Sequence, residues 1–121
     1  MYYLFLDDFR DVDFIKEKYP LLNKYQWIIA KSFKGFRETV LRNGLPEFVS
    51  FDHDLADEHY EYAYANAIPY SKFKQLTGLE CALWLVGFCC GKGLELPKWE
   101  VHSFNKQGKE NIISVLKHLT V

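Results

Sequence analysis

The stretch that decides the fold is residues 48–54, which read Phe48-Val49-Ser50-Phe51-Asp52-His53-Asp54. The first four residues form a short apolar run with one small side chain, which predicts a buried strand. Two carboxylates and a histidine follow at once, and a buried strand does not tolerate them. We therefore expect the chain to reach the edge of a sheet at Asp52. In open α/β folds, ligands bind at this edge, beyond the carboxyl ends of the strands.

Strand and helix patterns alternate along the rest of the chain. Apolar runs at residues 2–6, 27–30 and 99–103 predict three more strands, and amphipathic segments lie between them. This alternation predicts an α/β fold with a parallel sheet covered on both faces. Right-handed crossovers favour a single three-layer, doubly wound sheet of about four strands in the order 2-1-3-4.

Local signals predict where the helices begin and end. Asp11 or Asp13 caps the first helix, which ends before Pro20. Ser32 caps the second, and Asn43-Gly44 ends it. Its expected apolar face consists of Phe33, Phe36, Val40 and Leu41. Thr77 and Glu80 form a capping box before residues 79–90, which are apolar nearly all round and are expected to be heavily buried. Gly91 or Gly93 ends this helix. Ile112, Val115, Leu116 and Leu119 mark the last helix.

Composition limits the class of protein. With 121 residues, of which 49% are hydrophobic, residues 1–121 are expected to form one domain with a substantial core, and disorder is excluded. A net charge of −1 argues against wholesale capture of nucleic acid, although a local basic patch stays open. Cys81, Cys89 and Cys90 are expected to be reduced and buried, which favours a cytoplasmic protein. We identify no signal peptide and no membrane span, so no membrane partner is expected.

Residues 55–76 are the least regular part of the chain. A connection of this length is often a lid or binding loop, and Tyr60, Tyr62 and Tyr64 occupy alternate positions in it. A short extra hairpin or helix that packs its tyrosines on the surface explains the same pattern equally well. His59 in this segment and His118 near the end are expected to face solvent.

Polar clusters follow three of the four predicted strands. They are Asp7-Asp8, Asp52-His53-Asp54 and His102-Ser103-Phe104-Asn105. Parallel strands bring all three to one edge, and the first and third strands are expected to be neighbours about 5 Å apart. Carboxylates this close repel each other unless a cation or a shared proton lies between them. A divalent cation, Mg²⁺ or Mn²⁺, is the simplest explanation, although each Asp alone is also suited to capping the following helix.

For each of the other polar residues at the same edge, the sequence allows both a functional and a structural interpretation. His53 and His102 are candidates for proton transfer or phosphate binding, or they are structural histidines. Ser103 and Asn105 are suited to phosphate oxygens, or to turn and cap chemistry. Arg10 would bind phosphate as a fork, or pair with Asp8 or Asp54. Thr77 and Gly78 open a helix whose amides make an anion site, although the capping box alone explains Thr77.

Four motifs in this order resemble the cyclic-phosphate-processing receiver-like domains. The motifs are Leu6-Asp7-Asp8-Phe9-Arg10, Asp52-His53-Asp54-Leu55, Thr77-Gly78 and His102-Ser103-Phe104-Asn105. The resemblance implies a receiver-like fold and a phosphoesterase role on 2′,3′-cyclic phosphate ends of RNA or on related cyclic nucleotides. Asp11-Val12, Ala56 and Lys106-Gln107-Gly108 depart from the usual pattern and affect loop shape. An ordinary receiver carries Lys after its last strand, where this chain has His-Ser, which argues against phospho-relay signalling.

The sequence therefore predicts a small metal-assisted phosphoesterase. Asp7, Asp8 and Asp52 would hold the metal. The catalytic residues would be His53, His102, Asp52 and Asp54, and the phosphate-binding residues would be Arg10, Thr77, Gly78, Ser103 and Asn105. The tyrosine-rich segment would stack a base. Three alternatives stay open: a metal-free enzyme, a signalling or nucleotide-binding module with Asp52 as phosphoacceptor, and a non-catalytic interaction protein.

Overall fold

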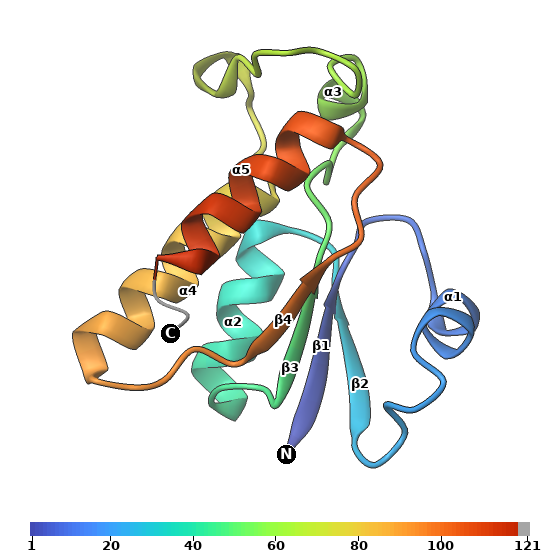
Figure 1. Ribbon diagram of the computed structural model, residues 1–121, viewed down its shortest axis with the longest axis vertical. Helices are drawn as coiled ribbons and strands as arrows, with labels where there is room; N and C mark the ends of the chain where they lie inside the picture. The colour runs from blue at the N-terminus through green and yellow to red at the C-terminus, as the bar shows by residue number, and fades with distance from the viewer. Residues whose placement is uncertain (119–121) are drawn as a thin grey trace.

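The computed structural model describes residues 1–118, which fold around one sheet of four parallel strands. The strand order is β2-β1-β3-β4, so the predicted order 2-1-3-4 is confirmed (Figure 1). The strand expected at 99–103 ends two residues early, because the polar cluster at its end already leaves the sheet. Leu119 lies outside the described residues. The strands are β1 (Tyr2–Leu6), β2 (Gln26–Ala30), β3 (Phe48–Phe51) and β4 (Lys98–Val101).

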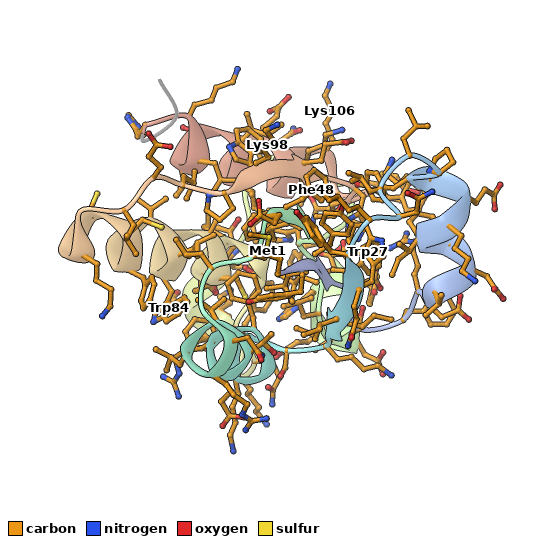
Figure 2. The ribbon with its side chains drawn as sticks, turned by 90° about the horizontal axis from the view of Figure 1, so that it is seen from below. Met1, Trp27, Phe48, Trp84, Lys98 and Lys106 are labelled. Atoms are coloured by element: carbon orange, nitrogen blue, oxygen red, sulfur yellow. The ribbon has the colours of Figure 1, made fainter. Side chains whose placement is uncertain are left out.

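Helices cover both faces of the sheet, as Figure 1 shows. The helices are α1 (Val12–Lys18), α2 (Phe33–Asn43), α3 (Asp57–Tyr60), α4 (Gly78–Lys92) and α5 (Lys106–Lys117), with a 3₁₀ turn, η1 (Tyr70–Lys72). Side chains alternate between the two faces of β1, so that Leu4 and Leu6 pack with α2, α4 and α5, whereas Tyr3 and Phe5 pack with α1. Figure 2, a view from below, shows side chains filling the space on both sides of the sheet.

The predicted helix ends agree with the structure. Asp11 caps α1 by accepting from the Asp13 amide, and Ser32 caps α2 by accepting from the Gly35 amide. Thr77 and Glu80 form the expected capping box of α4. Gly93, not Gly91, ends α4 in the left-handed conformation, which glycine adopts without steric cost. No helix in the described part of the chain has the length and apolar character to cross a bilayer.

Three residues that were expected to be buried are exposed. Leu41 is 60% exposed and Leu83 is 51% exposed, because α2 and α4 each keep one side in water. Cys90 is exposed as well, whereas Cys81 and Cys89 are buried as expected. Apolar character all round a helix therefore did not mean that the chain itself covers every side.

His59 was expected in solvent but is buried, because it closes the 55–76 segment. Its Nδ1 accepts from the Leu55 amide at 2.9 Å, and its Nε2 donates to the Gln75 carbonyl oxygen at 2.8 Å. Glu58 accepts from the Lys74 and Gln75 amides next to it. The two ends of the segment are thus joined by hydrogen bonds, and the segment contains the short helices α3 and η1 rather than a hairpin.

Candidate functional site

The three polar clusters meet at one edge of the sheet. The strand hydrogen bonds continue one step past the strands, since the Asp7 amide donates to Ala30, the Asp52 amide to Leu6 and the His102 amide to Phe51. This fixes where each side chain leaves the sheet. Asp7, Asp52 and His102 are all buried, and each offers one potential ligand atom within 4.8 Å of the other two.

Asp7 is the most heavily hydrogen-bonded of these groups. Its Oδ1 accepts from the Phe9 and Arg10 amides, both at 2.8 Å. Its Oδ2 accepts from Arg10 Nη1 at 2.8 Å and from His102 Nε2 at 2.9 Å. Burial disfavours the charge, but the bonds from His102, Arg10 and Phe9 outweigh it and hold the pKa of Asp7 well below its ordinary value. Asp7 is therefore an anion at any physiological pH.

Arg10 supplies the cation that two neighbouring carboxylates need. Its Nη1 lies 2.8 Å from Asp7 Oδ2 and 3.6 Å from Asp52 Oδ2. The pairing with Asp8 or Asp54 that the sequence left open is not what the structure shows. A divalent metal was the simplest explanation for the close carboxylates; the Arg10 guanidinium lies near both of them, and Asp7, Asp52 and His102 are also placed so that they could hold a metal ion. The rings of Phe14 and Phe104 lie 5.2 and 4.7 Å from the Arg10 guanidinium carbon.

Asp52 has one carboxyl oxygen that makes no hydrogen bond. Its Oδ1 accepts from the His53 amide at 2.9 Å, but its Oδ2 is buried and is the one buried side-chain polar atom of the described residues without a hydrogen-bond partner. Burial, together with the negative charge of Asp7, raises the pKa of Asp52 to about 8. At neutral pH Asp52 therefore holds a proton for most of the time and has an oxygen available to a ligand.

His102 donates to the same oxygen of Asp7, Oδ2, as Arg10 does. Its ring stacks on Phe5 at 4.4 Å between centroids. Because Asp7 is ionised and only accepts, His102 Nε2 carries the proton of this bond. Burial lowers the pKa of His102 despite the opposing effect of Asp7, so the ring is neutral and Nδ1 accepts from the Ser50 hydroxyl at 2.6 Å. Ser50 in turn accepts from the buried hydroxyl of Tyr19.

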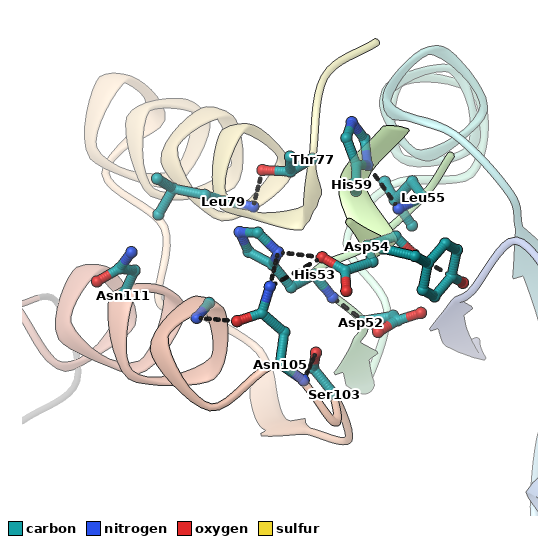
Figure 3. A network of polar contacts seen from close by, with 12 residues as sticks. Asp52, His53, Asp54, Leu55, His59, Thr77, Leu79, Ser103, Asn105 and Asn111 are labelled. Carbon is teal, nitrogen blue, oxygen red and sulfur yellow. Dashed lines mark hydrogen bonds and ion pairs between the residues drawn. The ribbon is translucent and has the colours of Figure 1, made fainter. Parts of the chain in front are cut away.

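His53 and Asp54 belong to a second network, which Figure 3 shows. The His53 Nδ1 donates to Asp54 Oδ1 at 2.7 Å, and its Nε2 accepts from the Tyr70 hydroxyl at 2.9 Å. Asn105 Nδ2 also donates to Asp54 Oδ1, at 3.1 Å. Both ring nitrogens of a fully buried histidine are thus occupied. His53 and Asp54 join β3 to α5 and to the 55–76 segment, and their role in proton transfer stays a prediction.

Two glycines allow helices to approach this network closely. A Cβ at Gly78 would collide with the Asp52 carbonyl group, and a Cβ at Gly108 would collide with the His53 ring. The start of α4 and the first turn of α5 therefore lie directly against residues 52 and 53. This close approach encloses the fully buried His53 ring.

The start of α4 follows the capping-box interpretation, which the sequence offered beside an anion site at Thr77 and Gly78. The Thr77 amide donates to Glu80 at 3.0 Å, and the Gly78 amide donates to the His53 carbonyl oxygen at 2.8 Å. The Leu79 amide donates to Thr77 Oγ1 at 3.1 Å. Figure 3 shows this cap beside His53. All three N–H groups have partners within the chain, so they do not present donors to an anion.

Ser103 and Asn105 follow the turn-and-cap interpretation. Ser103 Oγ accepts from the Asn105 amide at 3.1 Å, and Asn105 Oδ1 accepts from the Gly108 amide at 2.9 Å, which caps α5. Both residues are buried, whereas Phe104 between them is 79% exposed. These bonds hold the turn from β4 to α5 in a defined shape.

Asp8 lies at the rim and outside the cluster of Asp7, Asp52 and His102. Its Oδ1 accepts from the Tyr60 hydroxyl at 2.7 Å, and the same hydroxyl lies 3.3 Å from the Asp54 carbonyl oxygen. Burial and Asp8 raise the pKa of Tyr60, so its hydroxyl stays a donor. The sequence did not single out Tyr60 for this position, and only its place in the tyrosine-rich segment hinted at a role.

Tyr62 and Tyr64 of that segment do not face the site. Tyr62 packs on Phe73, with ring centroids 5.7 Å apart. Tyr64 is 97% exposed and lines a separate groove of about 350 Å³ with Lys106 and Gln107. The segment therefore brings Tyr60 and Tyr70, but not Tyr62 or Tyr64, to the edge of the sheet.

Comparison with known proteins gives one match. A family model described as the cyclic-phosphate processing receiver domain matches residues 2–118. No curated protein and no solved structure matches the chain. The match covers all four strands and the whole of the site described above.

Proposed function

Since this chain belongs to the cyclic-phosphate processing receiver domain family, we propose that it is a phosphoesterase that opens 2′,3′-cyclic phosphate ends of RNA or related cyclic nucleotides. The observation that carries the proposal is the pairing of Arg10 with a buried, unpartnered oxygen of Asp52. A guanidinium binds phosphate oxygens as a fork, and a carboxyl group with a pKa of about 8 is suited to proton transfer near neutral pH.

Opening the ring requires two proton movements. Water adds to phosphorus and forms a new P–O bond, while one P–O bond of the ring breaks. The departing ribose oxygen takes up a proton, and the attacking water loses one. The product is a phosphate monoester on the other ribose oxygen. A site for this reaction therefore needs a cationic group for the phosphate, an acid and a base.

The residues at the sheet edge fill these roles. Arg10 would turn from the carboxylates to the phosphate, which also uncovers Asp52. The protonated Asp52 would give its proton to the departing ribose oxygen from Oδ2. The rim carboxylate of Asp8, oriented by Tyr60, would accept the proton of the attacking water. Asp7 and His102 act as positioning residues, because they hold Arg10 rather than face solvent.

A divalent cation, Mg²⁺ or Mn²⁺, fits this site in part. The unpartnered Asp52 Oδ2 is an oxygen ligand of the kind these cations prefer, whereas Asp7 already accepts four hydrogen bonds. Binding would require Arg10 to leave, after which Asp52, Asp7 and the rim carboxylate of Asp8 would hold the ion. When bound, the metal would polarise a phosphoryl oxygen.

The remaining predicted site residues would position the machinery. His53, Asp54 and Asn105 fix the turn after β3 against α5, and Ser103 fixes the turn after β4. The three cysteines are unpaired, which fits work in a reducing compartment such as the cytoplasm. The expected partner is a nucleotide or an RNA end, not a membrane.

Hydrolysis of 2′,3′-cyclic nucleotides tests the proposal, with wild type, Asp52→Asn and His102→Ala compared in the presence of Mg²⁺ and in chelator. Both substitutions are expected to lower turnover by at least about 100-fold, the usual effect of losing an acid or its support. Circular dichroism confirms that the variants fold. Equal turnover in all three would remove the catalytic assignment.

A second candidate is a receiver-like signalling or nucleotide-binding module with Asp52 as phosphoacceptor and no hydrolysis. The same free Oδ2 favours it, since that oxygen is available as a nucleophile when Asp52 is ionised. The test is labelling with acetyl phosphate. Labelling that Asp52→Asn abolishes, without turnover of cyclic nucleotides, would favour this candidate over the phosphoesterase.

A further inference from the structure

Two of the most exposed large apolar side chains of residues 1–118 come from the turns that form the site. Phe9 is 84% exposed and directly precedes Arg10, and Phe104 is 79% exposed in the turn between β4 and α5. Exposed aromatic side chains beside a charged centre are typical of ligand contacts, because covering their apolar surface with a ligand removes it from water. The hydrolytic chemistry proposed above uses neither ring.

Phe104 is tied directly to the proposed phosphate-binding residue. The guanidinium carbon of Arg10 lies 4.7 Å from the centre of the Phe104 ring, within the range of a cation–π contact. The ring centre of Phe14 lies 5.2 Å from the same carbon. A ligand that takes the guanidinium by its phosphate therefore has the rest of its structure beside the exposed Phe104 ring.

The turn that carries Phe104 is held in place. Ser103 and Asn105 on either side are buried and bonded to each other, and Asn105 also bonds to Asp54 and caps α5. A ring projected from such a turn loses little further freedom when a ligand packs on it. A rigid, exposed aromatic ring is the form of contact that proteins use to stack single bases of RNA.

We propose that Phe104 stacks on the nucleobase of the terminal nucleotide whose cyclic phosphate Arg10 binds, and so makes the site selective for base-bearing cyclic phosphates. This inference rests on the proposed function. It replaces the expectation that the tyrosine-rich segment stacks the base, since the Tyr60 hydroxyl is bonded to Asp8, Tyr62 packs on Phe73 and Tyr64 lies in a separate groove. The exposed Phe9, next to Arg10 in the sequence, would be a second contact.

The test compares two substrates: 2′,3′-cyclic AMP and a base-free five-membered cyclic phosphodiester, glycerol 1,2-cyclic phosphate. Phe104→Ala is expected to raise the KM for 2′,3′-cyclic AMP by about 5-fold to 100-fold, the range for loss of one base–aromatic stack, with kcat little changed. The KM for the base-free substrate should stay within about twofold of wild type. Phe104→Tyr should restore the wild-type KM, because its ring also stacks.

Leu21→Ala is the matched control. Leu21 is 91% exposed but lies between α1 and β2, at the opposite edge of the sheet, so its removal should change neither KM. Fluorescence of Phe104→Trp gives a readout that does not depend on turnover, since stacking of adenine on the indole should quench its emission. Titration with 2′,3′-cyclic AMP and with a short RNA that ends in a cyclic phosphate distinguishes a free nucleotide from an RNA end as the source of the base.

The outcomes separate this inference from the proposed function. If Phe104→Ala turns over both substrates as wild type does, and if the nucleotide does not quench the fluorescence of Phe104→Trp, the stacking role is overturned. The phosphoesterase assignment is then kept. An equal rise of both KM values would assign Phe104 to holding Arg10 and would also overturn it. If wild type turns over neither substrate but the nucleotide quenches the fluorescence of Phe104→Trp, the phosphoesterase assignment is overturned. Recognition of the base is then supported.

Discussion

Arg10 Nη1 lies 3.6 Å from Asp52 Oδ2, a buried oxygen that has no hydrogen-bond partner among the described residues. The distance is too long for a hydrogen bond, whereas the same Nη1 bonds to Asp7 at 2.8 Å. Arg10 thus places a positive charge near Asp52 but does not donate a hydrogen bond to its Oδ2. A cation or a phosphate that enters the site has to compete with Arg10 or recruit it.

Removal of the guanidinium should therefore improve cation binding. In Arg10→Gln, Asp7 and Asp52 lose their positive neighbour, so the metal-free protein should be less stable by about 2–3 kcal/mol. Mn²⁺ should bind at least about tenfold more tightly than to wild type, because it no longer competes with Arg10. Electron paramagnetic resonance of Mn²⁺ and urea unfolding with and without the ion measure the two effects.

Arg37→Gln serves as the control for this variant, since Arg37 is exposed on α2. Its stability and its Mn²⁺ affinity should match those of wild type. If Arg10→Gln binds Mn²⁺ no better than wild type does, the site is not one that Arg10 and a cation share.

Asp52 should make stability depend on pH. Its pKa is about 8 in the folded protein and 3.8 as the ordinary value, so the folded state holds a proton between these limits that the unfolded state has lost. The free energy of unfolding should therefore fall as the pH rises from about 4 to 8, at up to about 1.4 kcal/mol per pH unit. The low pKa of Asp7 acts in the opposite sense, since its stabilising effect is lost only as the pH falls below about 4.

Urea unfolding in chelator between about pH 5 and 8 measures this slope, and Asp52→Asn should flatten it. A slope of the same size in Asp52→Asn would place the responsible group elsewhere.

The chain from Tyr19 through Ser50 to His102 should contribute to stability as a unit. Ser50→Ala leaves the Tyr19 hydroxyl and His102 Nδ1 buried without partners, at a cost of about 2–4 kcal/mol for the two groups. Tyr19→Phe in the same background should cost less than it does alone. The double-mutant cycle in urea measures the coupling, and Ser71→Ala on the exposed η1 turn should change nothing. Additive effects of the two substitutions would argue against the chain of bonds.

Gly108 should tolerate no side chain. Alanine normally stabilises a helix by up to about 1 kcal/mol relative to glycine, but here its Cβ would collide with the buried His53 ring, so Gly108→Ala should destabilise the protein. Gly87→Ala is the matched control on α4, where nothing lies within 4 Å, and it should stabilise. Thermal unfolding of both variants checks the difference in sign. A stabilising Gly108→Ala would mean that α5 does not pack on His53.

Local patterns predicted much of this fold. The bounds of β3 follow from a short apolar run that ends at Asp52, and the start of α4 follows from the spacing of Thr77 and Glu80. Parallel strands then carried the polar clusters to one edge. What could not be predicted depends on contacts between distant residues: the burial of His59 is decided by the Gln75 carbonyl, and the partner of Arg10 is decided by the turn after β1.

The surroundings of the predicted site residues could not be read from the sequence for the same reason. Residue types indicated proton transfer for His53, but only the approach of α5 and of Tyr70 shows that both ring nitrogens are occupied. Phe104 carried no chemical signal in the sequence, and its importance comes from its exposure beside Arg10.

The central claim is that a cyclic phosphate takes the position between Arg10 and Asp52. Nuclear magnetic resonance of the arginine side-chain N–H groups tests it most directly, with Arg10→Gln used to assign the Arg10 signal, while 2′,3′-cyclic AMP is added to Asp52→Asn, which binds without turning over. We predict that the Arg10 signal shifts and saturates with nucleotide, and that the other arginines do not respond. An unchanged Arg10 signal while the nucleotide binds elsewhere would contradict the account.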